Sequence, residues 1–243
     1  MKKIITIFLL LASIIKPVSG QNKDNYSDYF LTSSFKLYQS ADRELAYHML
    51  PFIRERFIQE LEDTLSFTNK YDSLSRYIGI KYSSDSLLKT YCWSERSGGC
   101  CHTSATFAQF KTKSGQIKHL DLEKSVVSGN EIFITDLQKV EIKNKPFYLL
   151  LGWGTCCGAA HFQTAKIYEI QNDTLIQVDS AFENNKTLYI GAKRSQKIEL
   201  KYSPKTKILS YNKYKFDSDT GFYNLEKSIV KWELKDSGFK KIN

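Results

Sequence analysis

From residue 77 to its end, the sequence alternates between short strand-like segments and polar turn signals. The segments are rich in Ile, Val, Thr, Tyr and Phe, and two of them joined by a short polar turn are typical of a β-hairpin. The predicted hairpins pair residues 77–82 with 87–93, 106–112 with 117–122, 132–142 with 147–153, 165–170 with 175–182, and 198–202 with 207–215, and a last strand follows at 230–234. The sequence therefore predicts a mainly β fold, built as an antiparallel hairpin meander over 77–243.

Two internal repeats suggest that some hairpins are copies of one unit. Residues 78–91 (IGIKYSSDSLLKTY) align without gaps with 198–211 (IELKYSPKTKILSY), and 98–110 (GGCCHTSATFAQF) resemble 154–167 (GTCCGAAHFQTAKI). Hairpins that cannot bury a face alone stack on one another, which predicts a partial propeller, a barrel or a sandwich. Unrelated hairpins rich in Lys and Tyr would also look alike, but the repeated Cys-Cys pair is harder to explain in that way.

Residues 35–70 carry helical signals. Ser40 can cap a helix that runs to about Leu50, and Pro51 is expected to break or restart it. Beyond the proline, apolar residues recur at every fourth position, at Ile53, Phe57, Leu61 and Leu65, which predicts a helix with one face packed on the sheet. We expect one globular domain over 35–243, helical over 35–70, after a loose lead-in over 21–34.

The first twenty residues have the three parts of a secretory signal peptide. Lys2 and Lys3 precede an apolar run over 4–15, and small residues at 18–20 precede Gln21. The run has twelve residues, whereas a membrane-spanning helix needs roughly twenty. We therefore expect 1–20 to be a cleaved signal peptide and the mature protein to be periplasmic or secreted, with no integral membrane association after cleavage.

The charge of the chain argues against a nucleic-acid partner. The formal net charge is +9, and it falls to about +6 when Lys2, Lys3 and Lys16 leave with the signal peptide, because 32 basic residues then face 26 acidic ones. Only six residues are arginines, and the lysines are spread along the chain, so no clustered basic footprint is visible. The sequence identifies no partner and leaves a protein or a glycan as the candidate ligands.

Several hairpin motifs occur in a characteristic order: YSSDSLLKTYCW, NKPFYLLLGWG, AKIYEIQNDTLIQV, KYSPKTKILSY and a closing KWEL with GFKKI. In this order the chain resembles a group of signal-peptide-bearing proteins from Bacteroidetes-type bacteria, from about Tyr71 to the C-terminus. The resemblance implies export and a β architecture, and that group has no assigned activity. Many of its members have a tryptophan-threonine-glycine loop where this chain has residues 95–102, so the cysteines here depart from the pattern.

Five cysteines are the strongest candidates for a special role. They lie at Cys92, in the pair Cys100-Cys101 and in the pair Cys156-Cys157, and His102 and His161 accompany the two pairs. In an exported protein such cysteines indicate disulfides. Adjacent Cα atoms are about 3.8 Å apart, which is shorter than the roughly 4.4–6.8 Å that a disulfide prefers, so bridges between the two pairs are favoured. Five thiols leave one unpaired, and the sequence does not select one of the fifteen possible arrangements.

Two other interpretations of these residues stay open. The two pairs and their histidines could converge on Zn or Cu, with Cys100, Cys101, His102, Cys156, Cys157 and His161 as ligands, although zinc modules usually space their cysteines by two to four residues. A cysteine beside a histidine could also act as a nucleophile or a redox pair. In the disulfide interpretation no cofactor is needed.

No linear catalytic signature appears in the chain. It contains no phosphate-binding Gly-rich loop, no nucleophile elbow, no HExxH and no calcium loop. Fifteen Tyr and fifteen Phe residues suit core and cross-strand pairs, and exposed ones could bind sugar or peptide. The sequence therefore favours an exported, non-enzymatic binding or interaction domain stabilised by disulfides, with a metal-binding or thiol-redox protein as the alternative.

Overall fold

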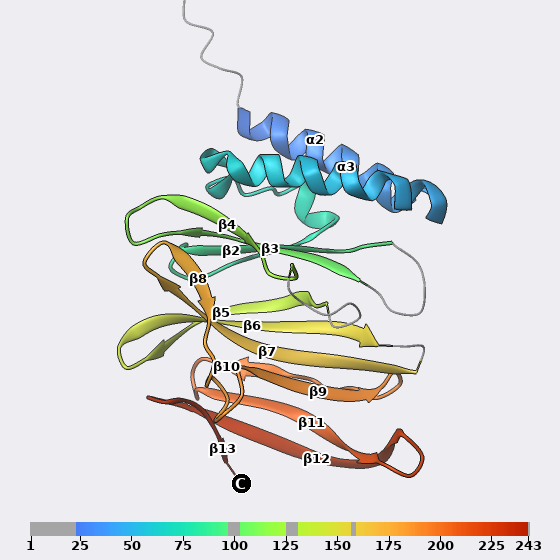
Figure 1. The fold of residues 1–243 in the computed structure, drawn as a ribbon, viewed down its shortest axis with the longest axis vertical. Coiled ribbons are helices and arrows are strands. Elements are labelled where there is room, and N and C mark those ends of the chain that lie inside the picture. The colour runs from blue at the N-terminus through green and yellow to red at the C-terminus, as the bar shows by residue number, and fades with distance from the viewer. Residues whose placement is uncertain (1–22, 97–102, 125–130, 157–158, 243) are drawn as a thin grey trace, which may run out of the picture.

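A computed structural model describes residues 23–96, 103–124, 131–156 and 159–242. The described residues form two long helices followed by three antiparallel sheets (Figure 1). Sheet A contains β1 (Gly79–Tyr82), β2 (Leu88–Ser94), β3 (Ser104–Lys111) and β4 (Ile117–Asp121). Sheet B contains β5 (Phe133–Ile142), β6 (Lys145–Cys156), β7 (Ala160–Gln171), β8 (Thr174–Gln177) and β9 (Thr187–Lys193). Sheet C contains β10 (Lys201–Ser203), β11 (Ile208–Asp217), β12 (Phe222–Lys235) and β13 (Gly238–Ile242).

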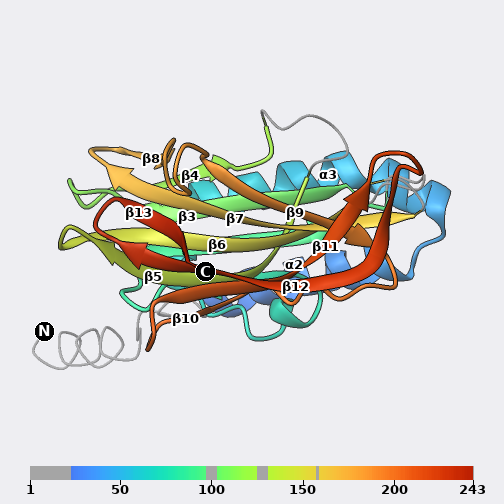
Figure 2. The ribbon, with the colours of Figure 1, turned by 90° about the horizontal axis from the view of Figure 1, so that it is seen from below.

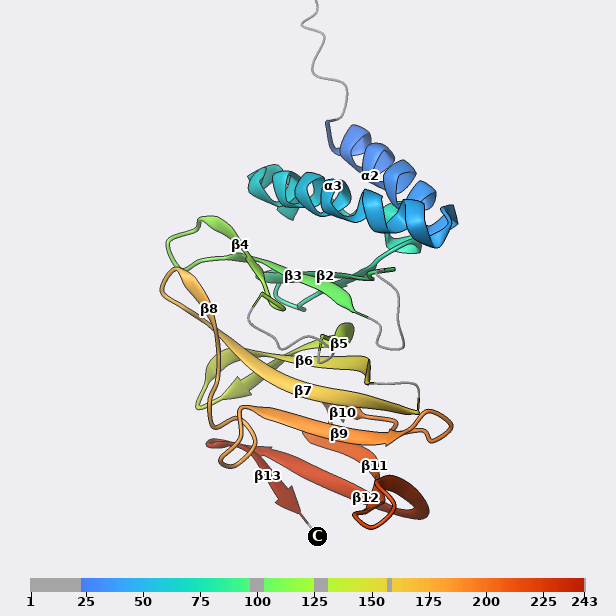
Figure 3. The ribbon, with the colours of Figure 1, turned by 45° about the vertical axis from the view of Figure 1, so that its right-hand side comes forward.

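The helices and the three sheets stack as four layers, which stay separate in two views (Figures 1 and 3). Three hydrophobic cores lie between them. The first joins the helices to sheet A, the second joins sheet A to sheet B, and the third joins sheet B to sheet C. Strand β2 shows how this works, because Trp93 belongs to the first core and its neighbour Cys92 to the second. Both faces of sheets A and B are therefore covered.

Sheet B has an unusual edge. Strand β7 pairs with β6 on one side, and on its other side it pairs first with β9 and then with β8. The register places Ala165 opposite Leu188 and Tyr168 opposite Gln177. Strand β9 thus extends the edge of sheet B toward sheet C, where it contacts β11 and β12.

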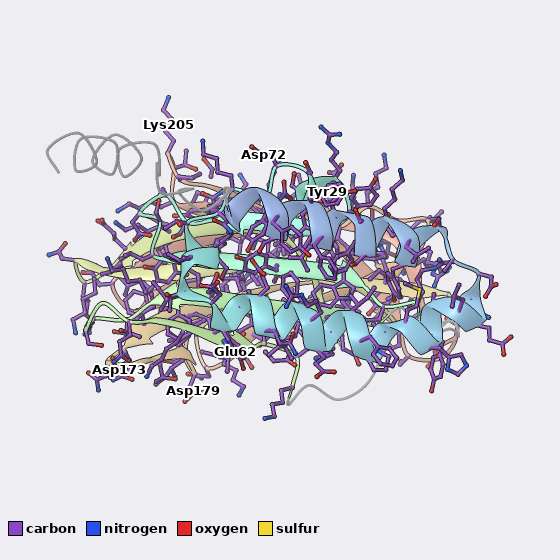
Figure 4. All side chains as sticks on the ribbon, turned by 90° about the horizontal axis from the view of Figure 1, so that it is seen from above. Tyr29, Glu62, Asp72, Asp173, Asp179 and Lys205 are labelled. Carbon is purple, nitrogen blue, oxygen red and sulfur yellow. The ribbon has the colours of Figure 1, made fainter. Side chains whose placement is uncertain are left out.

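The helical layer consists of α2 (Lys23–Ser40) and α3 (Arg43–Glu62), which lie side by side over sheet A (Figure 4). Two short 3₁₀ turns, η1 (Thr64–Phe67) and η2 (Leu74–Arg76), lead from α3 to the first strand. The predicted apolar stripe is confirmed at Ile53, Phe57 and Leu61, which are buried, whereas Leu65 is exposed in η1.

The structure corrects three details of this region. Residues 23–34, expected as a loose lead-in, are helical because Leu31 begins a buried stripe that continues through Phe35 to Tyr38. Helix α3 is capped by Asp42, whose side chain accepts a hydrogen bond from the Leu45 amide, and not by Ser40. Pro51 lies inside α3 without ending it, because the buried stripe beyond the proline holds the helix on sheet A.

The predicted fold class is confirmed: the protein is mainly β, with antiparallel hairpins and a helical segment near the N-terminus. The three stacked sheets correspond to a layered sandwich, and the described strands close no barrel. The repeats match equivalent positions, since 78–91 contains the first hairpin of sheet A and 198–211 the first hairpin of sheet C. Strand β9 was not predicted, and β12 begins at Phe222, eight residues before the expected strand at 230.

Candidate functional site

Cys92 is the one cysteine whose side chain the structure describes, and it is a free thiol. It is 0% exposed, lies in the core between sheets A and B, and donates to the carbonyl of Ile134 at 3.5 Å. Burial raises its pKa to about 12, so the thiol stays protonated at neutral pH. A buried, protonated thiol is a poor nucleophile and a poor metal ligand.

The other cysteine candidates lie outside the described residues. This holds for Cys100, Cys101, His102 and Cys157, while Cys156 is described by its backbone alone, as the last residue of β6. The strands that flank the two pairs occupy equivalent places, because β2 and β3 are the middle strands of sheet A as β6 and β7 are of sheet B. The ends of these four strands that face the cysteine pairs lie at the same side of the molecule, at the right of Figures 1 and 3.

His161 lies on β7 in a hollow of about 530 Å³ that Trp153, Arg194 and Glu199 also line. Both ring nitrogens have partners. Nδ1 accepts a hydrogen bond from Trp153 Nε1 at 3.1 Å, and Nε2 lies 2.8 Å from the carbonyl of Gln196. The proton therefore lies on Nε2, and a metal ion would have to displace one of these two bonds. Among the described residues, no group of three or more His, Cys, Asp or Glu side chains could hold a metal ion.

A second concave surface lies where β9 meets the far half of the β11–β12 hairpin. We call it the aromatic–lysine groove, and its volume is about 740 Å³. It is lined by Tyr189, Ile190 and Gly191 of β9, by Tyr211, Lys213, Tyr214, Lys215 and Phe216 of β11, and by Tyr223, Glu226, Lys227 and Ser228 of β12. Five of its twelve lining residues are aromatic, and Ile190 is its only aliphatic residue of comparable size, so the groove differs from an ordinary apolar cleft.

The shape of the groove depends on a bend in the hairpin. The pairing register of β11 and β12 shifts between Tyr214 and Phe216, and such a bulge bends a strand and increases its twist. The end of the hairpin bends out of sheet C at the right of Figure 2, near the end of β9. Gly191 permits the close approach, because a Cβ at this position would overlap the hydroxyl end of Tyr223.

The aromatic rings of the groove are held by other rings. Tyr189 stacks on Phe162, with ring centroids 4.8 Å apart, and Phe216 packs edge to face on Tyr223 at 5.1 Å. Tyr189 and Phe216 nevertheless remain 52% and 54% exposed. They therefore present fixed apolar faces to solvent, which suits stacking with a ligand.

The charge of the groove is positive. Lys213, Lys215 and Lys227 line it together with a single carboxylate, Glu226, which forms an ion pair with Lys215 at 3.4 Å. The formal net charge of the lining residues is therefore +2. Burial also raises the pKa of Tyr223, so its hydroxyl remains a hydrogen-bond donor at neutral pH. The site combines ammonium groups, phenol hydroxyls and flat apolar rings.

The basic, aromatic character continues past the groove. Lys193 ends β9 two residues after Gly191, and its ammonium lies 5.7 Å from the ring centroid of Phe222 at the start of β12. These two residues line a further hollow of about 410 Å³ with Ala159, Arg194 and Ser195. A ligand longer than the groove would therefore meet the same kinds of side chain beyond it.

Sequence reasoning did not find this groove, because it did not predict β9 or the first half of β12. A signal was present in 187–193, where TLYIGAK alternates in the manner of a strand. The structure has Ile190 and Ala192 buried and Tyr189 exposed, as that alternation predicts.

Comparisons of the chain with known proteins find no relative. No family model matches the chain, and neither the curated proteins nor the solved structures include a significant match. None of the helices in the described part of the chain is long and apolar enough to cross a membrane.

Proposed function

We propose that this protein is an exported, non-enzymatic binding domain whose ligand lies in the aromatic–lysine groove. The observation that carries the proposal is the groove itself, where exposed rings on β9 and β11 stand beside three lysines. Its one carboxylate is exposed and paired with Lys215. This lining offers contacts to hold a ligand, and it offers no buried acid–base pair of the kind that general catalysis needs.

Export is the second part of the proposal, and it rests on the leader-like pattern of residues 1–20. The test is expression of the full chain in a Gram-negative host, followed by fractionation and mass spectrometry of the intact protein. We expect a periplasmic product that begins near Gln21. A full-length product retained in the cytoplasm contradicts export and leaves the groove proposal to be tested separately.

The binding role can be tested by affinity electrophoresis in native gels that contain a panel of soluble polysaccharides and proteins. We expect at least one of these to retard the wild-type protein, and we expect the double variant Phe216→Ala/Lys215→Ala to lose the retardation. Both side chains are exposed, at 54% for Phe216 and 65% for Lys215, so removing them should change the free energy of unfolding by less than about 1 kcal/mol.

A matched control removes one aromatic and one lysine from the opposite end of the stack. Tyr29 and Lys36 are exposed on α2. Figure 4 shows Tyr29 on this helix, and Figure 1 shows the helical layer and sheet C at opposite ends of the stack. Tyr29→Ala/Lys36→Ala should bind as the wild type does. Retardation that the two double variants lose equally, or a wild-type protein that no member of the panel retards, contradicts the proposal.

A further inference from the structure

We infer that the ligand of the aromatic–lysine groove is an acidic polysaccharide, a chain of sugar units that carry carboxylate or sulfate groups. This inference rests on the proposed binding function and specifies its substrate class. It follows from three features of one surface: the rings are flat and exposed, the lysines carry more positive charge than the single carboxylate neutralises, and the surface continues along β9 beyond the groove.

The rings favour a sugar over a peptide. A protein ligand is usually recognised through pockets that accept its apolar side chains, and such pockets are lined largely by aliphatic as well as aromatic groups. Here five of the twelve lining residues are aromatic and Ile190 alone is aliphatic. A pyranose has apolar C–H faces and a rim of hydroxyls, which matches a tyrosine's apolar face and polar hydroxyl.

The lysines favour an acidic sugar over a neutral one. Glu226 neutralises one of the three ammonium groups, through its 3.4 Å ion pair with Lys215. Lys213 and Lys227 then remain as a net charge of +2 over the groove. An ammonium acts as a compact point charge with rotatable donors, so it suits single carboxylates or sulfates spaced along a chain.

The length of the basic, aromatic surface favours a polymer over a single sugar. The groove continues along β9 to Lys193, whose ammonium lies against the Phe222 ring, and to the hollow beside Arg194. The same alternation of ring and cation therefore repeats along the edge of sheet B. A single-stranded nucleic acid also binds to rings and cations, and an acidic polypeptide also binds to cations, so both belong in the test.

The test compares probes that differ in charge alone. Isothermal titration calorimetry would measure the dissociation constants of polygalacturonate and of its methyl-esterified form, which has the same backbone without carboxylates. We expect the ester to bind at least about tenfold more weakly, because it lacks the carboxylates that the lysines would contact. Dextran sulfate and dextran form a second pair, which distinguishes sulfate from carboxylate as the recognised group.

Two variants separate the contributions of charge and stacking. Lys213→Gln/Lys227→Gln should weaken polygalacturonate binding about tenfold and leave the weaker binding of the ester nearly unchanged, because it removes only the charge contacts. Phe216→Ala should weaken both probes, since it removes a stacking face. Tyr29→Ala/Lys36→Ala should weaken neither.

The outcomes distinguish a wrong ligand class from a wrong site. If the ester binds as tightly as polygalacturonate, or if poly-glutamate or a single-stranded oligo-dT binds as tightly as either acidic glycan, the inference is overturned and the groove remains a binding site. If neither acidic glycan binds while another probe is retained by the groove, the inference is also overturned. If the groove variants leave every affinity unchanged, the proposed function itself fails.

Discussion

At the scale of single residues, Lys89 is a lysine buried among aromatic rings. It lies on β2 and is only 1% exposed. Its ammonium donates to the carbonyls of Asn69 at 2.5 Å and Ser66 at 3.3 Å. It also lies between the rings of three tyrosines, with centroid distances of 4.4 Å to Tyr71, 5.0 Å to Tyr82 and 4.9 Å to Tyr91. These contacts join the segment after α3 to sheet A.

The burial of Lys89 predicts a pH-dependent stability. Burial lowers its pKa to about 7, partly opposed by the Glu60 carboxylate, whereas an unfolded lysine titrates near its usual value of about 10.4. Between these values the native state binds fewer protons than the unfolded state, so the free energy of unfolding rises with pH, by up to about 1.4 kcal/mol per pH unit. Urea unfolding at pH 7.5, 8.3 and 9.0 measures this dependence, and the free energy of unfolding should rise less with pH in Lys89→Met than in the wild type.

Other groups also make the stability depend on pH, since burial lowers the pKa of Lys166 and raises that of Cys92. The contribution of Lys89 is therefore the difference between the wild type and Lys89→Met. Burial raises the pKa of Glu123 to about 7. Loss of its proton therefore lowers the free energy of unfolding as pH rises toward 7, and this loss is nearly complete at pH 8.3 and 9.0. Lys205→Met is the control, since Lys205 is exposed in the turn between β10 and β11 (Figure 4). If the wild type and Lys89→Met gain stability equally between pH 7.5 and 9.0, Lys89 does not titrate there.

The burial of single polar residues such as Lys89 could not be predicted from the sequence. A lysine within LLKTYCW is typical of a solvent-facing residue of a half-buried strand, and the burial of Lys89 depends on the Tyr71 ring and on the carbonyls of Ser66 and Asn69, which come from outside its hairpin. The burial of Cys92 has the same origin, because sheet B covers the second face of sheet A. The sequence pattern of one hairpin does not indicate which distant part of the chain will pack on it.

At the scale of elements, the hairpins were predictable because their signal is local. Each predicted hairpin has its turn within the sequence window that defines it, and β1–β2, β3–β4, β5–β6, β7–β8 and β10–β11 all form. Strand β9 has no hairpin partner, since it pairs with the first half of β7, more than twenty residues earlier. The aromatic–lysine groove depends on that distant pairing and on the bend in β11, so it could not be assembled from local signals.

The contact between β9 and the β11–β12 hairpin can be tested at Gly191. Its backbone has no positive φ, so alanine is compatible with the strand, and the three atoms nearest to a Cβ there all belong to the Tyr223 side chain. We expect Gly191→Ala to lower the free energy of unfolding by about 1 kcal/mol when Tyr223 is present, because the ring must move. In a Tyr223→Ala background the same change should stabilise the protein by about 0.5 kcal/mol, because alanine restricts the unfolded chain.

The wild type, Gly191→Ala, Tyr223→Ala and the double variant form a double-mutant cycle. Denaturant unfolding of these four proteins gives the coupling energy between the two sites. A reversal of sign establishes that Tyr223 occupies the space above Gly191. Effects of Gly191→Ala that are equal in both backgrounds would show that the hairpin does not approach β9 as described, and the groove would then lose one of its walls.

At the scale of the whole molecule, the sequence predicted the repetition but not the stacking order. The repeat of 78–91 in 198–211 marks the first hairpins of sheets A and C, and the run of apolar residues in β6, where Phe147 to Leu151 are all buried, is typical of a strand covered on both faces. The layered order of helices, sheet A, sheet B and sheet C follows from which faces meet, and that is a tertiary property. In the chain, one Cys-Cys pair comes between the middle strands of sheet A, and the other comes where the first middle strand of sheet B ends.

The free thiol of Cys92 reduces the fifteen disulfide arrangements to the three that use the two pairs, and bonds within adjacent cysteines are disfavoured by geometry. We therefore expect two bridges between Cys100-Cys101 and Cys156-Cys157, which would link sheet A to sheet B. Thiol labelling of protein isolated from an oxidising compartment should find one reactive group, and only in denaturant, because Cys92 is 0% exposed. Cys92→Ala should leave none.

Reduction should lower the free energy of unfolding by about 4 kcal/mol, because a link across roughly fifty-five residues restricts the unfolded chain. The second bridge, between neighbours already held together, should add little to that closure entropy. Peptide mapping without reductant identifies the partners. Five reactive thiols in the exported protein, or a bond within either pair, would contradict the proposed stapling, and the stacking of sheets A and B would then depend on their hydrophobic core alone.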